Sequence, residues 1–164
     1  MTHDLEYIQR AALVTTAASW IGTPYRHMGR VKGRTGGVDC IMLIAESFAE
    51  AGLIERPALP HYPQDWHLHR GAERYLAGLL RYTEEIPMDA PPQPGDVALW
   101  RFGRCFSHGA IVVEWPRIVH AYIGQGCVAE DVSRAPWLSH TGEPGPGTGK
   151  PRLVRFFSFW QKDR

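Results

Sequence analysis

Three side chains of the sequence could together perform nucleophilic chemistry: Cys40, His108 and His120. A cysteine can attack a carbonyl carbon when a neighbouring imidazole accepts its proton and a further polar group orients that imidazole. We therefore interpret Cys40 as a nucleophile, His108 as its base and His120 as the orienting group. This hypothesis requires the fold to bring one helix end and two strands together.

Residues 37–48 predict the helix end. Asp39 is a good N-cap, because its carboxylate can accept hydrogen bonds from the free N–H groups of the first turn. Apolar residues recur at helical spacing as far as Ala51, and Gly52 ends the helix. Cys40 then lies in the first turn, where the positive end of the helix dipole is expected to lower its pKa. The alternative is an inert cysteine, since free Cys is among the most buried residue types.

The two histidines lie on a predicted hairpin formed by residues 107–113 and 117–122, with the turn at residues 115–116. His108 and His120 are twelve residues apart, an even number. In an antiparallel hairpin with an odd-length loop, they project from the same face of neighbouring strands. One imidazole can therefore stand beside the other. If that face meets the N-terminus of the cysteine helix, the three side chains form a set of nucleophile, base and orienting group.

The hairpin also allows a competing interpretation. Cys105, His108, His120 and Cys127 could in principle form a tetrahedral zinc site, and Cys105 is at a permitted spacing from His108. However, Cys127 lacks a second close ligand along the chain. Each histidine could also be a satisfied core residue, with no chemical role.

The remaining pattern predicts helices first and short strands afterwards, which indicates an α+β fold with an antiparallel sheet. His67 and His69 lie in an irregular, proline-rich segment, and we interpret them as surface residues. We expect helices over 4–21, 40–51 and 71–82, strands over 97–100, 108–114, 117–123, 128–132 and 153–160, and loops over 29–37, 56–69 and 139–151.

Composition predicts one ordinary globular domain spanning residues 1–164. The net charge of +1 and the absence of a polybasic or long apolar run argue against nucleic acid and membrane partners. The first residues lack the basic start and apolar run of a signal peptide. Three cysteines at irregular spacing suit a reducing compartment. We therefore expect synthesis in the cytoplasm without a signal peptide.

Five short motifs follow one another along the chain: Gly22-Thr23-Pro24-Tyr25, Val38-Asp39-Cys40, Pro94-Gly95-Asp96-Val97, Ser107-His108-Gly109-Ala110-Ile111-Val112 and Ile118-Val119-His120-Ala121. In this order and spacing they resemble the NlpC family of bacterial cell-wall cysteine peptidases. The segments 20–27 and 63–66 are most similar to its phage-tail branch, which includes tail-tip assembly proteins and the cell-wall peptidase of gene-transfer agents.

This resemblance implies a papain-like fold, in which the cysteine helix packs on an antiparallel sheet of about five strands. It implies hydrolysis of the stem peptide of peptidoglycan, typically after γ-D-glutamyl, without a metal or organic cofactor. By motif position, Cys40 is the nucleophile, His108 the base and His120 the orienting residue. Tyr25 matches a tyrosine that shapes the oxyanion or substrate pocket, and Asp39 matches an acid that receives the free amine of a substrate L-alanine in some members.

The chain departs from the family pattern directly after the cysteine. Most members continue with a small hydroxyl residue and then glycine, whereas Ile41 and Met42 stand here. Two bulky residues leave the substrate preference open. The alternatives are an inactive phage-tail assembly component with the same fold, and another papain-like acyltransferase or amidase. Mounting on a virion tail, in contact with tail proteins, would deliver a peptidase that has no signal peptide.

Overall fold

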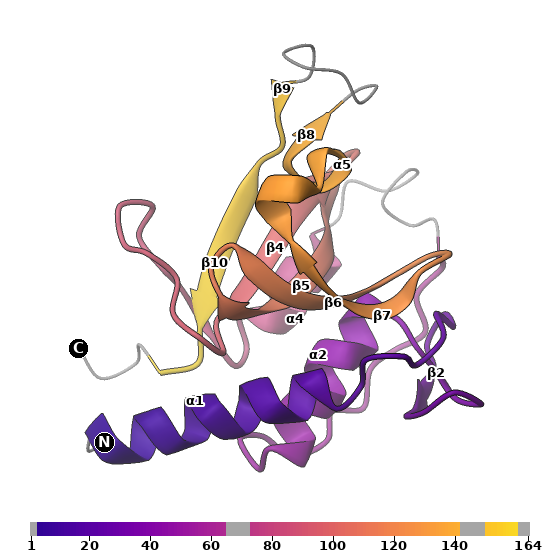
Figure 1. Cartoon of the computed structure of the whole chain (residues 1–164), viewed down its shortest axis with the longest axis horizontal. Helices are drawn as coiled ribbons and strands as arrows, with labels where there is room; N and C mark the ends of the chain where they lie inside the picture. The colour runs from indigo at the N-terminus through magenta and orange to yellow at the C-terminus, as the bar shows by residue number, and fades with distance from the viewer. Residues whose placement is uncertain (1–2, 65–72, 142–149, 161–164) are drawn as a thin grey trace.

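The structure is a computed structural model that describes residues 3–64, 73–141 and 150–160. Its longer helices lie together along one face of a sheet (Figure 1). Among the described residues, no helix is long and apolar enough to cross a bilayer. The helices are α1 (His3–Ala18), α2 (Cys40–Glu50), α4 (Arg74–Leu79) and α5 (Pro136–Ser139), with a short 3₁₀ helix η1 (Val132–Arg134). The strands are β1 (Arg30–Val31), β2 (Gly37–Val38), β3 (Glu84–Glu85), β4 (Val97–Phe102), β5 (Cys105–Glu114), β6 (Arg117–Tyr122), β7 (Gly126–Asp131), β8 (His140–Thr141), β9 (Lys150–Pro151) and β10 (Val154–Ser158).

The main sheet has six strands in the order β3-β10-β4-β5-β6-β7, and each neighbouring pair is antiparallel. This confirms the predicted α+β class. The expectation of about five strands is short by one, because the two-residue β3 pairs with the end of β10. A strand of two residues has no periodicity that a sequence pattern could reveal.

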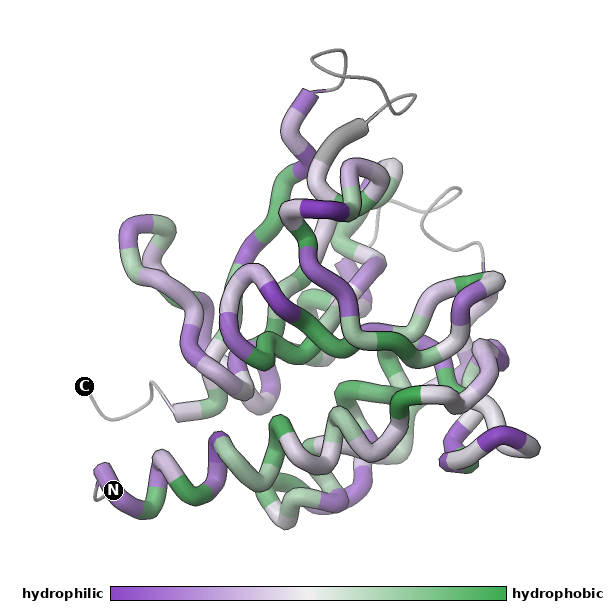
Figure 2. Tube along the Cα trace, viewed as in Figure 1, coloured by the Kyte–Doolittle hydropathy of each residue, from purple (hydrophilic) through white to green (hydrophobic). Residues whose placement is uncertain are grey.

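Both faces of the central strands are covered, which explains why the first four residues of β4 are all apolar. Val97 and Leu99 point into the core shared with α1 and α2. Ala98 and Trp100 point to the opposite face, where Leu138 of α5 packs against them. Figure 2 shows hydrophobic residues concentrated where the helices meet the central strands. The sheet can therefore bury groups on both sides, which matters for the polar side chains described below.

Arg10 fastens α1 to the sheet. Its guanidinium is buried, and Nη1 donates to Asp96 Oδ1 at 2.9 Å and to the Pro94 carbonyl at 2.8 Å. Nε donates to Glu6 Oε1 at 2.9 Å. The guanidinium also lies over the Trp160 ring, 4.1 Å from its centre. A buried charge is tolerated when it is paired and hydrogen-bonded in this way.

Three predicted segments differ from the structure. The helix expected over 71–82 is shorter, since α4 covers Arg74–Leu79 and residues 71–72 lie outside the described residues. The loop at 29–37 contains the antiparallel pair β1 and β2. The loop at 139–151 contains the antiparallel pair β8 and β9, and its middle lies outside the described residues, as do His67 and His69.

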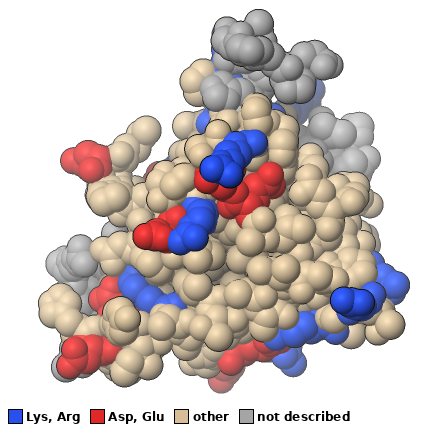
Figure 3. All heavy atoms as spheres, viewed as in Figure 1, with Lys and Arg blue, Asp and Glu red and all other residues tan. Residues whose placement is uncertain are grey.

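Charged side chains of both signs are interspersed on the face shown in Figure 3. The sequence has 18 basic and 17 acidic residues, which fits this mixed surface. Ion pairs such as Lys32 with Glu50 and Arg117 with Glu114 join charges on the surface. Exposed pairs of this kind contribute about 0–1 kcal/mol each, so the core dominates the stability.

Gly109 allows α2 to approach β5, and its replacement tests this packing. A Cβ atom there would lie 2.2 Å from the Tyr75 hydroxyl and 2.8 Å from Ile44 Cδ1. We expect Gly109→Ala to lower the free energy of unfolding by about 1–3 kcal/mol, as overpacked core positions do. Gly78→Ala is the matched control, because a Cβ on Gly78 in α4 meets nothing within 4 Å. It should raise stability by up to about 1 kcal/mol. Urea unfolding of both variants measures the difference, and equal effects would contradict the close packing.

Candidate active site

Cys40 is the first residue of α2, and Asp39 caps that helix as predicted. The Asp39 side chain accepts a hydrogen bond from the Met42 N–H, with Oδ1 2.9 Å from the nitrogen. The Cys40 carbonyl accepts from the buried Tyr75 hydroxyl at 3.2 Å. The cap and this hydrogen bond fix the backbone that carries the sulfur. The Cys40 thiol donates to the Ser107 carbonyl, with 3.8 Å between sulfur and oxygen.

The two histidines stand side by side, as the even spacing predicts. His108 lies on β5, paired with Trp100 of β4, and His120 lies on β6, paired with Ala110. Both histidines therefore belong to the sheet face of Ala98 and Trp100, whereas the body of α2 packs on the other face. His108 Nε2 and His120 Nδ1 are 2.9 Å apart and share a hydrogen bond. The residue His108 is 5% exposed and His120 is fully buried. The rings are therefore held by each other, away from solvent.

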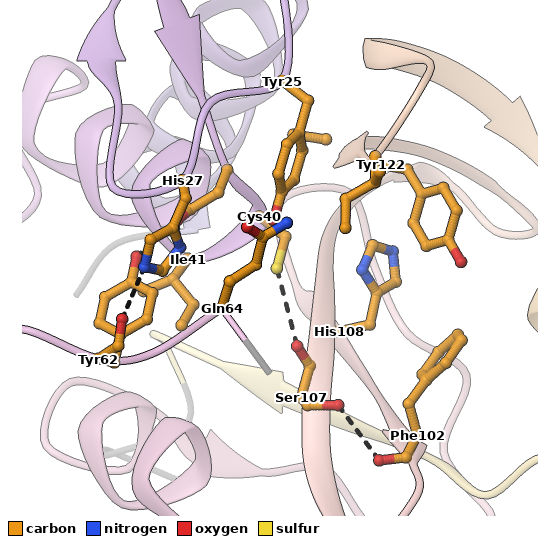
Figure 4. Close-up of a pocket in the computed structure, with 13 residues that line it drawn as sticks. Tyr25, His27, Cys40, Ile41, Tyr62, Gln64, Phe102, Ser107, His108 and Tyr122 are labelled. Carbon is orange, nitrogen blue, oxygen red and sulfur yellow. Dashed lines mark hydrogen bonds and ion pairs between the residues drawn. The ribbon is translucent and has the colours of Figure 1, made fainter. Parts of the chain in front are cut away.

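Cys40 and His108 line the same pocket, which has a volume of about 130 Å³. In Figure 4 the Cys40 sulfur lies on one side of this pocket and the His108 ring on the other. His120 is hydrogen-bonded to His108 and is not among the residues that line the pocket. Tyr25 and Ile41 also border the pocket. The structure thus brings the nucleophile and base candidates to one cavity, with the orienting candidate on the far side of the base.

Burial sets the protonation of this pair. It raises the pKa of the Cys40 thiol to about 12, and the nearby negative charge of Asp39 adds to the rise. Backbone N–H groups, among them that of Gly109, lower the thiol pKa but do not cancel the effect. The expectation of a lowered pKa at the helix N-terminus is therefore wrong, because desolvation of the thiolate exceeds the dipole effect. Burial also lowers the pKa of His108 well below its usual value, helped by His120 and Arg152.

Asp39 is more enclosed than the sequence suggests. Its side chain is 2% exposed. Oδ2 accepts hydrogen bonds from the Met28 N–H and the Tyr62 hydroxyl, both at 2.7 Å, and lies 3.5 Å from His27 Nδ1. An amine that binds this carboxylate must first displace the Tyr62 hydroxyl. Asp39 is thus held chiefly as a helix cap and a junction between segments.

Tyr25 lies in the pocket lining, as the motif implies. Burial raises the pKa of its phenol above the usual range, and negative charge on Cys40 or Asp39 would raise it further. The hydroxyl is therefore protonated at neutral pH and can donate a hydrogen bond. Its backbone forms an isolated parallel bridge with Val38, just before the cysteine helix.

Four contacts of the site were not expected from the sequence. Tyr62 and His27 meet at Asp39, and Tyr62 comes from a segment without periodicity, so no signal indicated it. Trp137 of α5 stacks on the His120 ring, with 5.8 Å between ring centres. Glu130 Oε2 lies 3.0 Å from His120 Nε2. Glu130 is ten residues after His120, and the same even-spacing rule could have found it.

The residues of the alternative zinc site are not gathered. In residues 3–64, 73–141 and 150–160, no group of three or more His, Cys, Asp or Glu side chains could hold a metal ion. Cys105 and Cys127 are fully buried in the hydrophobic core. Cys40, Cys105 and Cys127 are reduced thiols that form no disulfide with one another. The two histidines bind each other instead.

Comparison with known proteins gives a consistent result. The model of the NlpC/P60 family matches residues 22–144. The NlpC/P60 domain of the peptidoglycan hydrolase SagA is similar in structure, with a TM-score of 0.52 and 19% identity over 76% of this chain and 90% of that one. The peptidoglycan hydrolase RipB from Mycobacterium tuberculosis gives a TM-score of 0.57 and 15% identity over 97% of this chain and 68% of that one.

A lipoprotein-like member of the NLP/P60 family from Staphylococcus aureus gives a TM-score of 0.51 and 26% identity. That match covers 79% of this chain and 38% of the other. Among curated protein sequences, no significant match is found. The structural similarities identify the papain-like α+β fold of these proteins, with N-terminal helices packed on a six-stranded antiparallel sheet.

The charge of Asp39 contributes to the raised pKa of Cys40, and Asp39→Asn tests this directly. The amide keeps an oxygen for the helix cap but removes the negative charge, so the thiol pKa should fall. Each unit of decrease raises the thiolate fraction at neutral pH about tenfold. Iodoacetamide labelling of Cys40 against pH, read by peptide mass spectrometry, measures this shift. Asp131→Asn is the control, since Asp131 caps η1, a different helix from the one that carries Cys40. An unchanged Cys40 profile in Asp39→Asn would contradict the electrostatic explanation.

Proposed function

The chain belongs to the NlpC/P60 family, and from this membership we propose that it is a cysteine peptidase that hydrolyses stem peptides of peptidoglycan. The observation that carries the proposal is the shared pocket of Cys40 and His108, with His120 hydrogen-bonded to the back of His108. These are the parts of a nucleophile, base and orienting group. The substrate class is supported by SagA and RipB, both of which are peptidoglycan hydrolases.

In the first step, Cys40 Sγ attacks the carbonyl carbon of the scissile amide while His108 takes the thiol proton. The raised pKa of Cys40 and the lowered pKa of His108 favour a neutral thiol and a neutral imidazole at rest. The proton therefore moves as the sulfur attacks, rather than beforehand. His120 supports the resulting imidazolium through the 2.9 Å hydrogen bond between the rings.

The oxyanion that forms at the carbonyl needs donors in place before the reaction. The Cys40 backbone N–H, at the free N-terminus of α2, is one candidate. The Tyr25 hydroxyl is the second, since it lines the pocket and its raised pKa keeps it protonated. His108 then protonates the leaving amine, and the thioester on Cys40 is hydrolysed by a water molecule that His108 activates.

The pocket constrains how a substrate can bind. Its volume of about 130 Å³ is well below the roughly 300–1,000 Å³ of sites that enclose a whole small ligand. Ile41 fills part of the wall beside the cysteine, whereas Met42 is buried in the core and leaves the pocket free. We infer that the pocket holds a single residue of a peptide that binds in an extended conformation. The amide after γ-D-glutamyl is the first bond to test.

The second candidate function is a component that holds the same fold without hydrolysing a substrate, as in an assembly role on a phage tail. Two observations favour it: the Ile41 side chain narrows the pocket beside Cys40, and burial raises the pKa of the thiol to about 12. The first limits the room for a substrate beside the sulfur, and the second lowers the population of attacking thiolate. The phage-tail setting stays a prediction from the sequence. It includes synthesis in the cytoplasm, delivery on a virion and contacts with tail proteins.

Replacement of Cys40 tests the proposed reaction. Purified protein is incubated with a defined stem tetrapeptide, and the products are separated and weighed by mass spectrometry. We expect Cys40→Ala to lower turnover by at least about a thousandfold, because loss of a nucleophile removes the covalent route. Cys127→Ala is the matched control: it removes a thiol that lies in the core and should leave hydrolysis in place.

Two outcomes would overturn the proposal. Turnover in Cys40→Ala equal to that of the wild type would show that this sulfur is not the nucleophile. A wild-type protein that leaves stem peptides and whole peptidoglycan intact would favour the second candidate function.

A further inference from the structure

Glu130 extends the row of interacting side chains beyond the two histidines. It lies on β7, where it is paired with Ile118, while His120 is paired with Val128. Glu130 is therefore two residues away from the direct partner of His120 and projects from the same face. Its Oε2 lies 3.0 Å from His120 Nε2. The Glu130 side chain is 22% exposed, whereas His120 is fully buried, so the row runs from the surface to the pocket.

The protons of this row can be assigned from the chemistry of its members. A carboxylate only accepts hydrogen bonds, so His120 Nε2 must carry the hydrogen that faces Glu130. A neutral imidazole has one N–H, which leaves His120 Nδ1 as an acceptor. His108 Nε2 must then donate across the 2.9 Å contact. It follows that His108 Nδ1 carries no hydrogen and is the nitrogen free to take a proton.

The surroundings favour two neutral rings. Burial lowers the pKa of His120 as well as that of His108, and the hydrogen bond and charge of Glu130 offset part of the effect on His120. Trp137 stacks on the His120 ring and shields it from water. Two further titratable groups lie near the rings: Tyr122 on β6, and Arg152, which precedes β10. The apolar rings of Trp100 and Phe102 also lie against His108.

We infer that Glu130 is a positioning residue that selects the tautomers of both histidines and so leaves His108 Nδ1 ready to accept the Cys40 proton. The inference rests on the proposed function, in which Cys40 is the nucleophile and His108 its base. Without the carboxylate, His120 can adopt the opposite tautomer and donate from Nδ1 to His108 Nε2. His108 then carries its hydrogen on Nδ1 and cannot accept the thiol proton.

Nuclear magnetic resonance of the histidine nitrogens tests the assignment without a substrate. Protein labelled with ¹⁵N-histidine is recorded at neutral pH, and His108 and His120 are assigned by single replacements. In the wild type, both rings should be the Nε2–H tautomer. In Glu130→Ala, the Nδ1–H form should appear in both rings. Glu114→Ala is the matched control, because Glu114 is an exposed carboxylate on β5 that pairs with Arg117. Wild-type tautomers that persist in Glu130→Ala would overturn the inference.

Kinetics provide the second measurement. Glu130→Ala should lower kcat on a stem peptide by about 10- to 100-fold, the loss seen when the hydrogen-bond partner of a metal-binding histidine is removed, and leave KM nearly unchanged. Glu130→Gln should be intermediate, since its amide oxygen can still accept from His120 Nε2. A merely structural role would instead give equal losses in both variants, with the tautomers unchanged.

The two measurements separate this inference from the proposed function. An inactive wild type with Nε2–H tautomers that are lost in Glu130→Ala would refute the peptidase and support the role of Glu130. An active wild type whose tautomers and kcat do not respond to Glu130→Ala would refute the role of Glu130 alone.

Discussion

The packing of the first turn of α2 against the middle of β5 is the contact on which the candidate site depends. Cys40 opens the helix, and His108 and Gly109 are adjacent on the strand. Because Gly109 has no side chain, Tyr75 and Ile44 occupy the space beside it. Tyr75 in turn holds the Cys40 carbonyl. The sulfur and the imidazole are thus brought to one pocket by backbone and core packing, before any interaction between them is needed.

Burial of the Cys40 thiol and the His108 imidazole determines their pKa values. A thiolate or an imidazolium loses hydration there, so the pKa of Cys40 rises and that of His108 falls. Both groups are therefore neutral at rest, and in the proposed reaction the proton moves as the sulfur attacks. His108 is hydrogen-bonded to His120, and His120 to Glu130, so these side chains take the place of water as hydrogen-bond partners. Trp137 of α5 stacks on the His120 ring and so holds this row of side chains in place.

Local rules predicted a large part of this structure. The Asp39 cap, the helix behind Cys40 and the shared face of His108 and His120 all follow from spacing and side-chain chemistry, and the structure confirms them. The pKa of Cys40 was predicted in the wrong direction, because burial depends on tertiary packing that the helix pattern does not contain. Tyr62 at Asp39 and the pairing of β3 with β10 were missed for the same reason: both join segments far apart in the chain.

Trapping of an acyl-enzyme tests the central claim most directly. The protein is mixed with a stem peptide, quenched in acid and digested, and the mass of each cysteine peptide is measured. We predict a thioester on Cys40 whose added mass equals the acyl half of the cleaved substrate, with Cys105 and Cys127 unmodified. Cleavage that proceeds with no adduct on Cys40, or with the adduct on another residue, would contradict the account.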